Sequence, residues 1–189
     1  MNIALLVLRL VPGLLFMGHG LQKLVPPRLS PKFLAAHGLG GVAAGFDQMG
    51  LSPGLPLALL AGLGELGGGF LIASGLVTAL GSALLAAVMT VAILSVHLRN
   101  GIWNSAGGFE FPLLMLTAVY VVSAIGPGSL SLDHAAGISN WLGIHWADEN
   151  AVRAGAAVGI GAAAGVLSLG FARLRRTIGS PQREPNPVH

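Results

Sequence analysis

The chain has no cysteine, so it offers no disulfide, no thiol nucleophile and no thiolate ligand for a metal. It also has few charged residues: they make up 9% of the 189 residues, whereas soluble domains carry about 25%. Hydrophobic residues make up 53%, and the mean hydropathy is +0.77. A soluble protein of this length could not bury so much apolar surface, whereas a lipid bilayer solvates it. The composition therefore predicts an integral membrane protein.

Other absences narrow the range of functions. The sequence has no H-x-x-H or E-x-x-H pair of the kind that binds zinc or di-iron, and we predict no metal site. It has no Gly-rich strand–helix element for nucleotides. The 10 Lys and Arg against 7 Asp and Glu are typical of positive charge that sets membrane orientation, so we expect no nucleic-acid partner. Because thiols are absent, a redox role would require a bound cofactor or a partner protein to carry the electrons.

Five apolar stretches can cross the roughly 30 Å hydrocarbon layer as helices. They cover residues 3–25, 55–77, 78–98, 109–125 and 151–174. Closed helices are the natural structure, since lipid cannot satisfy exposed backbone groups. We therefore predict an all-α polytopic membrane helix bundle. It has a four-helix core in residues 1–133, a loop and an Ala/Gly-rich fifth transmembrane helix in 134–174, and a basic tail in 175–189 that we expect to be disordered.

The connections and the positive charges predict an orientation. In the long link at residues 26–54, we expect a short interfacial helix at 41–49. With five spans and an outside N-terminus, most of the basic residues fall on one side, which the positive-inside rule makes cytoplasmic. These residues are Lys23, Arg28, Lys32, Arg99, Arg173, Arg175, Arg176 and Arg183. The N-terminus is thus predicted outside and the C-terminus in the cytoplasm.

Ionisable residues inside a span usually face the bundle interior, where they have a partner. On the first helix, Arg9, Phe16, Gly20 and Lys23 recur at helical spacings and share a face. His19 lies beside this face, four residues before Lys23. The first helix therefore has a polar seam.

Glu65 lies ~15 Å into the second span, near the bilayer midplane. Gly62 and Gly69 lie on the same face of the helix, where small residues let another helix come close. The antiparallel order of the helices brings this carboxyl towards the seam of the first helix. The predicted cluster consists of His19, Gln22, Lys23, Glu65, His97 and Glu110. Arg9 lies towards the opposite face, where we expect an ion pair with Asp133.

Each of these residues also has a purely structural interpretation. Lys23 could extend its ammonium group to the headgroups, while His97 and Glu110 could be ordinary boundary residues in contact with water. Glu65 could be present only to pair with a base and fix the helix register.

His19 and His97 have a further functional interpretation, because they could ligate a haem across two helices.

Several motifs resemble those of the DoxX family of small bacterial membrane proteins. They are Arg9 followed by GLLF (13–16), GHGLQKL (18–24), ELGGG (65–69) with GL (75–76), His97, GFEFP (108–112) and GPGSLSLD (126–133). The resemblance implies a four-helix core with a polar interior in the bacterial cytoplasmic (inner) membrane. It also implies a link to respiratory oxidoreduction, because relatives include the quinone-reducing partner of thiosulfate oxidation. The family usually has four spans, so the stretch from Ala151 is an addition.

The leading hypothesis is a membrane subunit that binds a quinone, or docks a membrane or peripheral redox protein, at the predicted cluster. Glu65 and His19 would shuttle protons, and Lys23 would hold an oxygen or balance charge. Gln22, His97 and Glu110 would contact the bound cofactor. One alternative is a small ion or solute transporter that uses Glu65 as its ion site. The other is a structural adaptor without catalysis.

Overall fold

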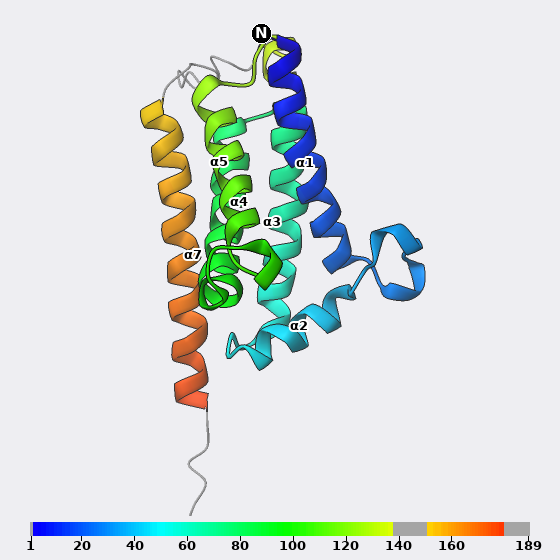
Figure 1. Cartoon of the computed structure of the whole chain (residues 1–189), viewed down its shortest axis with the longest axis vertical. Helices are drawn as coiled ribbons and strands as arrows, with labels where there is room; N and C mark the ends of the chain where they lie inside the picture. Colours follow the sequence, from blue (N-terminus) through cyan, green and yellow to red (C-terminus); the bar gives the residue numbers. More distant parts are fainter. Residues whose placement is uncertain (1, 138–150, 180–189) are drawn as a thin grey trace, which may run out of the picture.

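The computed structural model describes residues 2–137 and 151–179, and every regular element in these ranges is a helix (Figure 1). The principal helices run alternately up and down the long axis of the molecule, so consecutive ones are antiparallel. They are α1 (Asn2–Leu24), α3 (Gly54–Ser74), α4 (Thr78–Ala92), α5 (Glu110–Ile125) and α7 (Ala151–Gly179). The all-α polytopic bundle that the sequence predicts is therefore confirmed.

Four segments are long and apolar enough to cross a membrane by length and composition. They are Ile3–Leu24, Gly54–Ser74, Thr78–Asn100 and Arg153–Arg175. Helix α5 is apolar but has only 16 residues, which corresponds to about 24 Å of helix. The last of the four overlaps the predicted fifth span at 151–174 in all but its first two residues, so this stretch is as suitable for crossing as the others.

Short helices occupy the connections. They are η1 (Pro27–Leu29), η2 (Lys32–Leu34), α2 (Gly38–Gln48), the π-helical turn η3 (Ile93–His97), η4 (Leu98–Asn100), η5 (Asn104–Ala106) and α6 (Leu132–Ala135). Helix α2 confirms the short helix expected at 41–49, with a start three residues earlier. Turns η3 and η4 continue α4 and carry the third span to its end.

The apolar side chains divide between the interior and the outer faces. The interior holds one main cluster, formed by Phe16, Ile72, Leu85, Met89, Met115, Val119 and Val122. Many equally large side chains are exposed on the outside, including Leu60 on α3, Leu114 on α5 and Leu167 on α7. An apolar surface on every long helix would aggregate in water, but it matches a surrounding lipid phase.

Helix α1 packs directly against α3 through glycines. A Cβ atom at Gly69 would lie 2.6 Å from the carbonyl oxygen of Gly13, and one at Gly62 would lie 2.8 Å from the side chain of Leu24. The two glycines predicted to flank Glu65 as a packing surface therefore serve that purpose. This close contact fixes the depth at which the polar residues of the two helices meet.

Helix α7 lies beside α4 and α5 (Figure 1). It continues to Gly179, five residues beyond the predicted end of the fifth span. Residues 175–179, which we expected to belong to a disordered tail, are thus helical. Arginine has a high helix propensity, which favours this extension of α7. The rest of the predicted tail, residues 180–189, lies outside the described residues.

The two ends of the bundle differ in charge. One end carries the start of α1, the turn after α3 and α6, whereas the other carries α2, the 98–109 connection and the end of α7 (Figure 1). The second end holds the described residues of the predicted basic side: Lys23, Arg28, Lys32, Arg99, Arg173 and Arg175. The helix order therefore gathers these charges at one end, as the orientation prediction requires.

Candidate functional site

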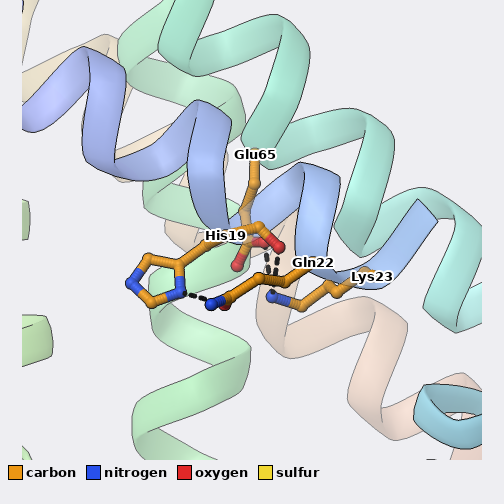
Figure 2. A network of polar contacts seen from close by, with 4 residues as sticks. All are labelled: His19, Gln22, Lys23 and Glu65. Carbon is orange, nitrogen blue, oxygen red and sulfur yellow. Dashed lines mark hydrogen bonds and ion pairs between the residues drawn. The ribbon is translucent and has the colours of Figure 1, made fainter. Parts of the chain in front are cut away.

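The structure joins Lys23 of α1 to Glu65 of α3. Nζ of Lys23 donates a hydrogen bond to Oε2 of Glu65 over 2.5 Å (Figure 2). The Glu65 side chain is 5% exposed and that of Lys23 is 21% exposed. A carboxylate inside a bilayer is stable only with a partner, and the ammonium group supplies one. The predicted contact between these two residues is thus confirmed.

Local sequence explains why the two groups meet. Glu65 lies in the middle of α3, between Gly54 and Ser74, and it is one of the few buried polar side chains. Lys23 lies in the last turn of α1, where a cation interacts favourably with the carbonyl end of the helix. From there its long side chain reaches back along the bundle towards the carboxyl.

His19 and Gln22 form a second layer around the ion pair. Nδ1 of His19 lies 3.0 Å from Oε1 of Gln22, so the tautomer with a hydrogen on Nδ1 donates to that oxygen (Figure 2). Nζ of Lys23 also donates to the backbone carbonyl of His19, over 3.3 Å. The predicted i to i+4 relation of His19 and Lys23 is thus a direct contact.

The ion pair lies in the wall of a cavity with a volume of about 530 Å³. Its polar lining includes His19, Lys23, Glu65 and His97, and most of the remaining lining is aliphatic or aromatic. The cavity is thus large enough for a small organic molecule and has its polar groups concentrated in one part. Such a lining suits an amphiphile with one compact polar head.

His97 and Phe111 bring the connection between α4 and α5 to the cavity. Nδ1 of His97 lies 2.8 Å from the carbonyl oxygen of Gly107. A carbonyl can only accept, so Nδ1 carries the hydrogen and Nε2 of the neutral ring is left as an acceptor. The ring of Phe111 meets that of His19 edge to face, with centroids 6.5 Å apart. These contacts fix the orientation of the two imidazoles that line the cavity.

Glu110 and Gln22 are placed differently from the other predicted residues. Oε2 of Glu110 accepts the backbone N–H of Asn104 over 2.9 Å, and Glu110 is not among the residues that line the cavity. It stabilises the 98–109 connection, and the structure does not bring it into the predicted cluster. Gln22 does not line the cavity either, but it orients His19 from behind.

Arg9 and Asp133 meet at the opposite end of the bundle, both almost completely buried. They do not form the direct ion pair that the sequence predicts. Nη2 of Arg9 donates instead to the carbonyl oxygen of Leu130 over 2.5 Å, and its Nε and Nη1 have no hydrogen-bond partner among the described residues. Both carboxylate oxygens of Asp133 face the backbone N–H of Val77, at 3.1 and 3.0 Å, and Arg9 acts on this carboxyl only through its charge.

Asp133 closes the turn between α3 and α4. Its own backbone N–H donates to the carbonyl oxygen of Gly75, and its side chain holds Val77, whose φ is 43°. Burial raises the pKa of the Asp133 carboxyl, while the Val77 N–H and the charge of Arg9 act in the opposite direction. A Cβ at Gly75 would lie 1.7 Å from Nη1 of Arg9, so only glycine fits there. These residues therefore have a structural role: they hold the turn between α3 and α4 in place.

Sequence reasoning missed the apolar part of the cavity. Phe16 and Met115 line it from α1 and α5, and Ser168 lines it from α7. Phe16 shares the polar face of α1 and could have been included on that ground. Nothing in the Ala- and Gly-rich sequence of α7 indicates which of its faces meets a cavity.

These features define a multi-pass helical membrane protein whose bundle holds a buried ion pair beside an apolar cavity. The family model described as DoxX matches residues 4–98, about half of the chain, and the chain therefore belongs to the DoxX family. No curated protein and no solved structure matches it. The match covers α1 from its third residue together with α3 and α4, so it includes Lys23 and Glu65, and it ends before α5 and α7.

Proposed function

We propose that this protein is a membrane subunit that binds a quinone beside Lys23 and Glu65 and supplies protons to it. The observation that carries the proposal is a buried ion pair in the wall of a largely apolar cavity of about 530 Å³. A quinone has a flat ring whose carbonyl oxygens accept hydrogen bonds, and the rest of the molecule is apolar. It thus matches both the polar and the apolar part of the lining. The resemblance to the DoxX family supports a respiratory setting, because relatives include the quinone-reducing partner of thiosulfate oxidation.

Each polar residue has a role in this proposal. Lys23 donates a hydrogen bond to a carbonyl oxygen of the quinone, because its flexible and partly exposed side chain can turn from Glu65 to a ligand. Glu65 holds the proton that the oxygen receives. His19, which is next to Lys23 and exposed, passes protons inward, since an imidazole ring can both accept and donate a proton.

The electrons must come from another protein. Reduction of a quinone to a quinol takes up two electrons and two protons. The bundle supplies the protons, and a membrane or peripheral redox protein docked on it supplies the electrons. Because the chain has no thiol of its own, we assign it the quinone-binding part of the reaction.

The test is binding of a decyl-substituted benzoquinone to purified protein in lipid nanodiscs, with proton uptake recorded during reduction. Glu65→Gln should weaken binding by about 10- to 100-fold, which corresponds to the loss of a charge-assisted hydrogen bond. Lys23→Met should have an effect of similar size. Glu110→Gln is the matched control, because this acid lies outside the cavity, and it should bind like the wild type.

Other outcomes would lead to other conclusions. Unchanged quinone affinity and unchanged proton uptake in Glu65→Gln would remove this residue from the mechanism and refute the proposal. Glu65-dependent ion flux in proteoliposomes without quinone would indicate a transporter. Lower thermal stability and weaker partner co-purification, without any loss of quinone binding, would indicate a structural adaptor.

The proposal places the chain in the bacterial cytoplasmic membrane with its N-terminus outside. The cysteine-free sequence allows a direct test with single cysteines and a membrane-impermeant maleimide. Ser129→Cys, at the α6 end, should react in intact cells, whereas Lys32→Cys, at the α2 end, should react only after permeabilisation. The reverse pattern would invert the orientation.

A further inference from the structure

The cavity extends beyond α1 and α3, the helices that carry the ion pair. Its lining continues along α3 through Leu57, Leu60 and Gly64 and along α4 through Leu84, Val88 and Val91. On the far side of α4 it is bounded by α7, through Ala164, Gly165, Ser168, Leu169 and Ala172. One continuous space thus joins the polar cluster to a groove with α4 as its floor and α3 and α7 as its walls.

Helix α7 is held tightly in the position that forms this wall. A Cβ atom at Gly161 would lie 2.0 Å from the carbonyl oxygen of Ala83, and one at Gly165 would lie 2.6 Å from that of Ala87. Only glycine lets the two helices approach so closely. Towards the α2 end, Leu169 packs with the buried Leu51 and closes the groove.

The groove has the chemistry and length of a chain-binding site. Ala164, Ser168 and Ala172 recur every fourth residue and therefore lie on one face of α7. They cover about 12 Å of helix, comparable to an extended chain of about ten carbons. The hydroxyl of Ser168 donates to the carbonyl of Gly165 over 2.7 Å, so it presents no free donor to the groove. Leu60 is 66% exposed, and the groove thus opens towards lipid beside it.

We infer that this groove holds the apolar chain of the ligand whose head binds at Lys23 and Glu65, and that α7 sets its preference for chain length. This inference rests on the proposed function. Continuity of the groove with the polar cluster favours this occupant over a second copy of the protein or a free bilayer lipid. The ligand class is then an amphiphile with a quinone-type head and a linear or prenyl chain.

The test compares a decyl-benzoquinone with the same head lacking its chain, on wild type and on two adjacent substitutions in α7. Ala164→Phe places a ring in the groove, whereas Ala163→Phe adds the same ring at an exposed position outside it. Ala164→Phe should weaken binding of the decyl probe by about tenfold, as overpacking predicts, and leave the chain-free probe unchanged. Ala163→Phe should change neither.

The outcomes separate this inference from the proposed function. Glu65→Gln should weaken both probes, because it acts on the head. Wild-type affinity that is the same for both probes, or a decyl affinity unaffected by Ala164→Phe, would overturn the inference even where Glu65→Gln still weakens the head.

A photoreactive group at the chain end gives a second measurement that does not depend on the fold of a variant. In the wild type it should label α7, and excess unlabelled decyl-benzoquinone should suppress the label. Labelling that excess quinone does not suppress would assign the groove to bilayer lipid and overturn the inference.

Discussion

Substitution of Gly20 by alanine tests whether the contact between α1 and α3 positions the ion pair. A Cβ atom at Gly20 would lie 2.6 Å from the backbone nitrogen of Leu66 and 2.7 Å from the carbonyl oxygen of Gly62. Both atoms belong to the α3 backbone, which cannot rotate out of the way. Helix α1 must therefore move away from α3 by about 0.8 Å before both contacts reach ordinary van der Waals distance.

The expected loss of stability follows from this displacement. Overpacking that shifts a backbone typically costs about 1–3 kcal/mol. For a chain of this size, each kcal/mol lowers the melting temperature by about 2–4 °C, so the predicted decrease is about 2–12 °C. Lys23 lies one helical turn after Gly20 and moves with it, which should also weaken quinone binding severalfold.

Gly18→Ala is the matched control on the same helix. No heavy atom lies within 4 Å of a Cβ at Gly18, and the exchange of residue types is identical. Both substitutions gain similar helix propensity, so their difference isolates the packing effect. The assay is thermal unfolding in detergent, followed by quinone titration. Equal melting temperatures for the two variants would show that α1 and α3 are not in the close contact described here.

Three further substitutions test the two ends of the bundle by thermal unfolding. Val77→Asn should raise stability by up to about 1 kcal/mol, because asparagine tolerates the left-handed φ of 43° better than valine; a lower melting temperature would contradict this. Asp133→Asn should lower stability by about 1–3 kcal/mol, because an amide offers the Val77 N–H one acceptor fewer. An unchanged melting temperature would show that Asp133 does not hold this turn. His97→Phe should lose about 1 kcal/mol with the hydrogen bond to Gly107, and protease sensitivity of the 98–109 connection should rise.

The sequence is sufficient to predict the helices and the central contact. Long apolar runs that end at Pro or Gly have almost no alternative to helix in lipid, and the predicted spans agree closely with α1 and α3. The pairing of Lys23 with Glu65 follows from helix order and depth, because few other charges lie within reach of either group. Predictions based on depth thus succeed where the bilayer restricts the choice.

Predictions for residues near helix ends are less accurate, because backbone groups compete for their side chains. Glu110 begins α5, and it accepts the N–H of Asn104 in the preceding connection. Asp133 likewise binds the N–H of Val77 in preference to Arg9. Spacing in the sequence gives no information about such backbone partners, since they depend on the conformation of the connecting turn.

The position of α7 could not be predicted either. Its sequence places small residues on several faces, so its hydrophobic pattern does not select one partner helix. The structure resolves this through Gly161 and Gly165, which contact the α4 backbone, whereas Gly155 and Gly159 have no neighbour. Glycine spacing alone would not distinguish these pairs.

The contrast between the two buried acids indicates which of them is functional. At the α6 end, Asp133 is fully buried and both its oxygens face a backbone N–H, so a ligand has no access to them. At the other site, the partner of Glu65 is a flexible and partly exposed lysine, and a cavity lies beside both. A backbone partner cannot leave without unfolding the turn, whereas the lysine side chain can turn to a ligand once Glu65 takes up a proton and loses its charge. The same chemical group is therefore structural in one place and available for binding in the other.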